Sequence, residues 1–176
     1  ALTPLCSDPE RVRPLKGIRL RAKLLLTLDG RQLRAEEGEI LFTEYGISGI
    51  AAMQLARAAA EARSVQGREP RLCVRLFEEH EAQALVLTRA RRFPGRAARE
   101  LLTGMLHSRV AQRLLSEAGI PGDIPCAGLA PEQLSALGRM LCEWTFPVRD
   151  TMGFAHAQVT AGGVDARQVD PATMQS

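Results

Sequence analysis

Apolar and polar residues alternate with a period of two over residues 17–28. The apolar positions are Ile18, Leu20, Ala22, Leu24 and Leu26, and basic residues occupy 19, 21 and 23. Such a period predicts a strand with one buried face. Asp29-Gly30 then predicts a hairpin turn, because glycine accepts the positive φ that the turn requires. A return strand and a further strand over 38–43 complete the β-meander expected for this part of the chain.

A loop of small residues, Gly46 to Gly49, follows the meander. Ser48 in this loop is a candidate N-cap, because its hydroxyl can accept a hydrogen bond from a free backbone amide. We expect it to start an alanine-rich helix over about 50–63. After a polar break, the alternating run "RLCVRLF" predicts a strand over 71–77.

Residues 78–144 have a helical period. We expect about four helices here. The first covers 78–92 and the second 96–106, the third follows a cap at Ser108, and the fourth has Pro131 in its first turn. In the last of them, apolar residues recur at helical spacing at Leu134, Leu137, Leu141 and Trp144. Strand periodicity returns in "TFPVRD" (145–150) and "GFAHAQVT" (153–160), just before the pair Gly162-Gly163.

This order of elements predicts an α+β fold in several parts. We expect residues 1–77 and 145–176 to form a β subdomain with one helix, and residues 78–144 to form a helical subdomain inserted into it. A parallel α/β sheet is disfavoured, because its strands and helices would alternate singly along the chain.

Composition adds little to this picture and excludes several classes of function. The 176 residues carry a net charge of only +3, with acidic and basic residues interspersed, so no stripe for a polyanion is evident. The four cysteines form no C-x-x-C pair and the three histidines are scattered, so we expect no metal site. We find no apolar run long enough to cross a membrane and expect a cytoplasmic protein with reduced thiols.

Two glycine-containing turns are candidate sites. In "TEYGISG" (43–49), backbone amides at a helix N-terminus would suit an anion or ligand, with Tyr45 projecting from the turn. From spacing alone we favour a simple turn, because glycine-rich turns before helices are common. "VTAGGV" (159–164) is equally a hairpin tip or a place of close backbone approach to a flat ligand.

The remaining candidates are polar side chains without an evident partner. His80, His107 and His156 would each need a positioned partner to act as a general base, and none can be located from the sequence, so we assign no catalytic residue. The arginine run "RARRFPGRAAR" (89–99) could contact phosphates, but we favour a solvated helix face.

Two long motifs resemble a known family. "GEILFTEYGISG" and, about a hundred residues later, "AHAQVTAGGV…VDPATMQS" are similar to the bacterial YhiN/BaiN-like flavoproteins, also called aminoacetone-oxidase-type FAD-dependent oxidoreductases. The resemblance implies a two-part FAD-binding Rossmann domain with an insert between its halves. That insert is a small antiparallel β-barrel of the translation-factor and flavin-reductase kind, interrupted by a helical subdomain. The chain resembles the insert and contains no G-x-G-x-x-G, so we expect the Rossmann domain to be absent from it.

The resemblance also implies which residues face the flavin and substrate cleft in the full-length parent. They are Thr43, Tyr45, Gly46, Ser48 and Gly49 of the first motif, and Thr160, Ala161, Gly162 and Gly163 of the second. Glu44 stands where the family usually has His, and Ile50 where it usually has Pro.

We therefore expect the substrate-facing insert domain of a FAD-dependent, NAD(P)-linked oxidoreductase. FAD would be the cofactor of the parent, and this chain by itself is expected neither to bind it nor to be catalytic. The expected partners are the parent's FAD-binding Rossmann domain and a small organic substrate, with no membrane and no nucleic acid. The alternatives are a stand-alone nucleic-acid-binding barrel and an interaction or dimerisation domain. Residues after about Gly163 should pack poorly or lean on a neighbouring molecule, because their normal partner would be missing.

Overall fold

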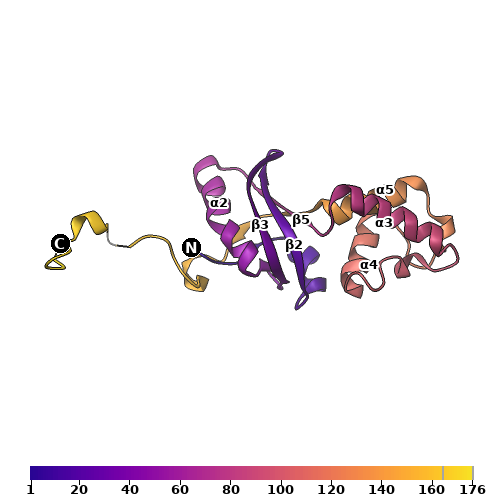
Figure 1. Ribbon diagram of the computed structural model, residues 1–176, viewed down its shortest axis with the longest axis horizontal. Coiled ribbons are helices and arrows are strands. Elements are labelled where there is room, and N and C mark those ends of the chain that lie inside the picture. Colours follow the sequence, from indigo (N-terminus) through magenta and orange to yellow (C-terminus); the bar gives the residue numbers. More distant parts are fainter. Residues whose placement is uncertain (164, 176) are drawn as a thin grey trace.

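The computed structural model describes residues 1–163 and 165–175, and the side chains of Val65 and Gln66 lie outside the description. Within these residues, one antiparallel sheet has the strand order β6-β5-β2-β3-β4-β1-β7 (Figure 1). Its strands are β1 (Leu5–Cys6), β2 (Arg19–Leu28), β3 (Arg31–Phe42), β4 (Gly46–Ser48), β5 (Arg71–Arg75), β6 (Trp144–Pro147) and β7 (Asp150–Thr151). The α-helices are α1 (Pro9–Val12), α2 (Ile50–Gln66), α3 (Glu79–Arg92), α4 (Ser108–Glu117) and α5 (Pro131–Cys142). The α+β class is confirmed.

The long hairpin of β2 and β3 is the centre of the sheet. Its turn is the predicted one, with φ of 49° at Asp29 and 79° at Gly30. The alternation in β2 places Ala22, Leu24 and Leu26 in the core, as the period of two requires. The separate strand expected over 38–43 is wrong. Gly38 pairs with Ala22 inside the ladder, so β3 continues unbroken for 12 residues.

The sheet curls so that its two edge strands come close together. β6 and β7 are the outermost strands, yet only Val148 and Arg149 separate them in sequence. The three peptide steps from Pro147 to Asp150 span at most about 11 Å. Two hydrogen bonds hold the segment that connects β6 to β7. The Val148 amide donates to the Pro70 carbonyl and the Arg149 amide donates to the Cys6 carbonyl, each at 2.9 Å. The sheet is thus barrel-like in curvature, while the ladders of the described residues leave the ring open.

The core of the sheet is aromatic as well as aliphatic. Phe42, Trp144 and Phe146 are fully buried, and their ring centroids lie 4.8 to 5.8 Å apart. Trp144 is not helical, although its spacing after Leu141 predicts a helix. The chain leaves α5 at Glu143, where φ is −136°, and Trp144 pairs with Val74 as the first residue of β6.

The helices α3, α4 and α5 lie together at the end of the sheet opposite the C-terminal tail (Figure 1). The expected helices over 78–92 and from Pro131 are confirmed as α3 and α5. The expected helix over 96–106 is wrong, because only Ala98–Glu100 makes a 3-10 turn. The amides of Ala98 and Arg99 donate instead to the carbonyls of Ile124 and Gly122, at 2.8 and 2.9 Å. Pairing with this distant loop replaces the local helical bonds.

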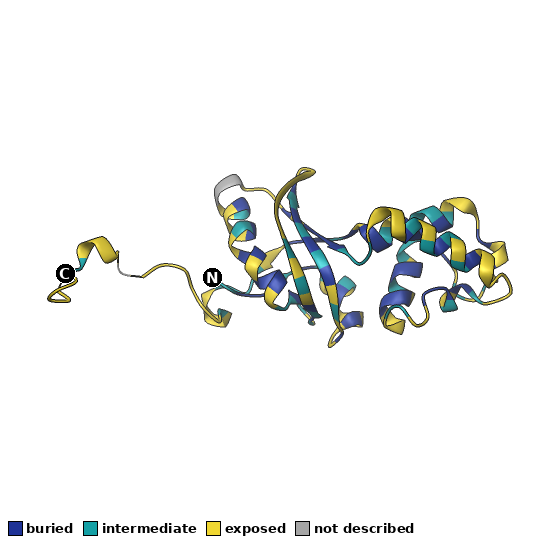
Figure 2. Ribbon diagram, viewed as in Figure 1, coloured by how far each residue is buried: buried dark blue, intermediate teal, exposed yellow. Residues whose placement is uncertain are grey.

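The chain after β7 forms neither the predicted strand nor the predicted hairpin. Residues Phe154–His156 make a 3-10 turn, and Val159 contributes a single bridge to Leu2. β7 has only two residues and is already paired with β1, so it offers little edge for a further strand. The tail extends away from the body and is exposed (Figure 2). Poor packing beyond Gly163 is confirmed for residues 165–175, with Val169 half-buried, whereas Val164 lies outside the described residues.

Candidate functional site

The first predicted motif folds into a closed turn between β3 and β4. The Thr43 amide donates to the Gly46 carbonyl at 2.9 Å. The Thr43 hydroxyl donates to the same carbonyl at 3.1 Å and accepts from the Gly46 amide at 3.0 Å. The polar groups of Thr43 therefore hold the turn. Tyr45 is half-buried beside it, and its carbonyl accepts from the Ser7 amide at 2.9 Å.

The glycines of this motif allow two backbones to approach closely. A Cβ on Gly46 would collide with the carbonyl of Leu5 and lie 2.9 Å from Cys6 Cα. Gly49 has a φ of 97°, and a Cβ there would lie 2.5 Å from the Glu39 carbonyl oxygen. Ser48 is not the predicted N-cap. It belongs to β4, and Gly49 caps α2 without any side-chain hydrogen bond.

The close contacts beside Gly46 and Gly49 show whether this turn could bind the phosphates of FAD. A phosphate-binding glycine loop needs its glycines open toward the ligand, so that backbone amides can reach the phosphates. Here the space beside Gly46 and Gly49 is filled by β1 and β3 of the same chain. The turn at Gly46 and Gly49 therefore does not offer the open glycine cradle that a phosphate of FAD would need.

Two adjoining grooves lie around the N-terminal half of α2, and we call them the paired grooves. The first has a volume of about 540 Å³ and is lined by Arg19, Glu37, Glu39, Ser48, Gly49, Ile50, Met53 and Gln158, among others. The second, of about 300 Å³, is lined by Leu2, Met53, Arg57, Val159, Thr160 and Ala161, among others. Met53 borders both grooves.

The paired grooves bring parts of both predicted motifs to one face of the molecule. Ser48 and Gly49 line the first groove, and Thr160 and Ala161 line the second. The other predicted residues, Thr43, Tyr45, Gly46, Gly162 and Gly163, line neither groove among the described residues. Gly162 and Gly163 lie in the exposed tail.

The paired grooves combine apolar side chains with a charged rim. Ile50 and Val159 are 67% and 62% exposed, so both present apolar surface to solvent beside the grooves. Arg19 and Glu39 on the rim form an ion pair of 2.7 Å. Close by in sequence, Lys16 hydrogen-bonds to Glu44 and lowers the pKa of that carboxyl. Such a surface suits contact with a flat ligand or another domain.

The histidines do not form a catalytic group with the paired grooves. His80 is exposed on α3, and His156 is exposed in a 3-10 turn instead of the predicted strand. His107 caps α4, and its Nδ1 accepts from the Arg109 amide at 3.2 Å. Within residues 1–163 and 165–175, no three His, Cys, Asp or Glu side chains gather as a metal site.

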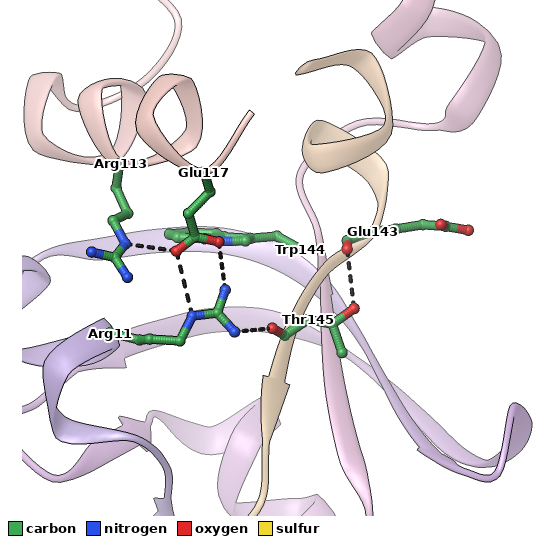
Figure 3. A network of polar contacts seen from close by, with 6 residues as sticks. All are labelled: Arg11, Arg113, Glu117, Glu143, Trp144 and Thr145. Carbon is green, nitrogen blue, oxygen red and sulfur yellow. Dashed lines mark hydrogen bonds and ion pairs between the residues drawn. The ribbon is translucent and has the colours of Figure 1, made fainter. Parts of the chain in front are cut away.

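A second polar site joins the helical elements to the sheet, and we call it the Glu117 cluster: Arg11, Arg113, Glu117, Trp144 and Thr145 (Figure 3). Glu117 accepts from Arg11 at 2.5 Å, from Arg113 at 2.6 Å and from the Trp144 indole at 3.2 Å. Arg11 also donates to the Thr145 carbonyl at 2.7 Å. The cluster therefore links α1, α4 and β6 through one partly buried carboxylate.

Comparison with known proteins places the chain in a family. Residues 1–159 match the family described as HI0933-like protein barrel and H2TH domain. The chain belongs to this family. The resemblance to the YhiN/BaiN-like flavoproteins is thereby confirmed. No described helix of this HI0933-like chain is long and apolar enough to cross a membrane.

Three curated relatives cover much of the chain. It is 36% identical over 164 residues to 3-dehydro-bile acid delta(4,6)-reductase of Clostridium scindens, covering 91% of this chain and 40% of that protein. It is 27% identical over 138 residues to ribosomal RNA dihydrouridine synthase of Haemophilus influenzae, covering 78% of this chain and 32% of that protein. The Escherichia coli protein of the same name is 26% identical over 149 residues, covering 82% of this chain and 35% of that protein. The chain thus spans 40% or less of the length of these relatives.

The arginine run of the HI0933-like chain contains a residue that the sequence analysis overlooked. Phe93 lies inside "RARRFPGRAAR", is 40% exposed, and has the guanidinium groups of Arg89 and Arg92 each 5.7 Å from its ring centroid. A solvated helix face is therefore an incomplete description of this run. The signal that was available is an aromatic residue directly between arginines, a pattern typical of base-stacking surfaces.

The buried thiol of Cys73 gives a testable consequence. Burial raises its pKa from 9.0 to about 11, with Arg75 opposing the shift. Because the folded pKa is raised, the thiol's contribution to stability is present below pH 9.0 and is lost as the pH rises toward about 11. At pH 8 only about one Cys73 in a thousand is thiolate. We expect iodoacetamide to leave Cys73 unmodified in the folded chain and to modify it in urea, as peptide mass spectrometry would measure. Modification in the folded chain at the rate of a free peptide thiol would contradict this.

Proposed function

We propose that this chain is the substrate-facing part of a FAD-dependent, NAD(P)-linked oxidoreductase. The alignment with the Clostridium scindens reductase carries the proposal, because it extends over 91% of this chain and 40% of that enzyme. In the parent, FAD would be bound by a separate Rossmann domain and would supply the redox chemistry. This chain would contribute one wall of the cleft. A cytoplasmic location is part of the same proposal.

The names of the relatives support one class of reaction. A 3-dehydro bile acid reduced at delta(4,6) and a uridine reduced to dihydrouridine both lose a carbon–carbon double bond that is conjugated to a carbonyl group. We infer that the parent adds a hydride and a proton across such a bond. The electron-poor double bond accepts the hydride, and the adjacent carbonyl takes up the developing negative charge.

The paired grooves are the part of this chain that would face the cleft. Ile50 and Val159 are exposed and apolar, and a neighbouring domain that covers them would remove about 25 cal/mol per Å² of apolar surface from water. The same domain would exclude water from the groove that Ser48 and Gly49 line. The chain's own residues thus orient and enclose the substrate, and none is assigned to proton transfer.

The test compares the full reading frame with this 176-residue chain. We expect the purified full-length protein to show flavin absorbance and to oxidise reduced nicotinamide anaerobically when an enone or uridine-containing RNA is added. The chain alone should show neither, and it serves as the matched control. A full-length protein without flavin after reconstitution with FAD would refute the proposal.

A further inference from the structure

A small pocket lies at the C-terminal end of α3, and we call it the Phe93 pocket. It has a volume of about 240 Å³ and is lined by Arg89, Phe93, Arg96, Glu100, Thr103 and Cys126, together with Leu101. Arg89 is fixed by its hydrogen bonds to the carbonyls of Leu101 and Thr103, at 2.6 and 3.0 Å. The aromatic ring of Phe93 therefore lies beside a guanidinium group that is already held in place.

The surroundings of the Phe93 pocket are basic. Residues 89–99 contain five arginines and no acidic residue. Two of them are neutralised locally, since Arg96 pairs with Glu100 at 3.0 Å and Arg99 pairs with Asp123. Arg91 and Arg92 are exposed, and neither forms an ion pair with another described residue. Two uncompensated positive charges thus directly precede an exposed aromatic ring in sequence, and the guanidinium of Arg92 lies 5.7 Å from the ring centroid.

We propose that the Phe93 pocket binds a single-stranded segment of RNA, with one base stacked on Phe93. Exposed aromatic rings next to arginines are the usual platform for unpaired bases, because every base has a π-face and the phosphates attract the cations. Arg92 beside the ring and Arg91, the residue before it, would contact phosphates next to the stacked base. This inference rests on the proposed function and narrows its substrate from any conjugated carbonyl compound to RNA.

The position of the Phe93 pocket favours a polymer over a small substrate. α3 has 14 residues and follows β5 after residues 76–78, so its C-terminal end lies about 20 Å along the helix from its first residue. The paired grooves border β3 and α2 of the sheet. α2 and α3 lie on opposite sides of the β2–β3 hairpin (Figure 1), so a steroid-sized molecule in the paired grooves would be remote from Phe93, whereas a polymer could extend over both sites. The Glu117 cluster holds the helices on the sheet, so the spacing between the two sites is fixed.

The experiment measures binding of a fluorescein-labelled single-stranded RNA of mixed sequence to the 176-residue chain at several salt concentrations. We expect affinity to fall as salt rises, because cations are displaced from the phosphates. Phe93→Ala should weaken binding about 10-fold, the cost of one lost stacking contact. Phe154→Ala is the matched control, since Phe154 is 77% exposed and outside the pocket. R91E/R92E should weaken binding and flatten the salt dependence, whereas R31E/R167E should do so far less.

Several results would overturn the inference. The chain could fail to bind RNA at low salt, or F93A and F154A could bind equally well while both remain folded by circular dichroism. Equal binding of polyglutamate would indicate a surface for acidic polymers in general. Failure here is separable from failure of the proposed function. If the full-length protein contains flavin and reduces an enone but this chain does not bind RNA, only the inference about the Phe93 pocket is refuted. If this chain binds RNA but the full-length protein contains no flavin, only the proposed oxidoreductase function is refuted.

Discussion

Gly46→Ala is expected to lower the free energy of unfolding by about 3 kcal/mol, because the new methyl group has no space. Its Cβ would collide with the carbonyl of Leu5 and lie 2.9 Å from Cys6 Cα, and both neighbours belong to the backbone of β1. β1 cannot move alone, since it pairs with β4 on one side and β7 on the other. Urea unfolding followed by circular dichroism measures the change.

The control for this substitution is Gly128→Ala. A Cβ on Gly128 meets no heavy atom within 4 Å, and the residue has no positive φ. We expect its effect to stay within about 0.5 kcal/mol, as for most surface substitutions. Equal stability of the two variants would mean that β4 does not press against β1 as described. The same result would reopen a ligand-binding role for Gly46.

Glu117→Ala is the second change with a large expected effect, about 2 kcal/mol of unfolding free energy. The substitution leaves Arg11, Arg113 and the Trp144 indole without their shared acceptor, while Trp144 itself stays fully buried. A partly buried donor without a partner loses its solvation and gains nothing in return. We expect Trp144 fluorescence to change in the native state as well, because α4 is released from β6.

Glu61→Gln serves as the control for charge removal. Glu61 pairs with Arg57 on the exposed side of α2, and exposed pairs of this kind contribute little. Its urea midpoint should match that of the unmodified chain. If Glu117→Ala also left the midpoint and the fluorescence unchanged, the Glu117 cluster would not hold the helices on the sheet. The fixed spacing between the paired grooves and the Phe93 pocket would then have no support.

Local patterns predicted the elements whose partners are close in sequence. The hairpin of β2 and β3 follows from alternation and from Asp29-Gly30, since both strands and the turn lie within one short segment. α5 begins at Pro131 as expected, because proline at a first turn is a local preference. The failed helix over 96–106 shows the effect of a distant partner. Residues 96–106 have a helical period, yet their amides bond to the loop at Gly122 and Ile124.

The candidate site divides in the same way. The two motifs were found from sequence, and Ser48, Gly49, Thr160 and Ala161 do line the paired grooves. The sequence could not show that the backbone of β1 occupies the space beside Gly46, because that contact joins residues some 40 positions apart. Phe93 was visible in the arginine run, but its exposure depends on how α3 ends against the following loop.

By itself, the sequence determined the α+β class, the hairpin, the membership of the family and the two motifs. Each of these depends on residues that are close together along the chain or that follow one another in a fixed order. Only the tertiary structure decided the curled sheet, the adjoining of the paired grooves and the Glu117 cluster, whose Arg11 and Glu117 are 106 residues apart. Hydrogen bonds and close contacts between such distant residues leave no local periodicity, because their geometry exists only after the elements have packed.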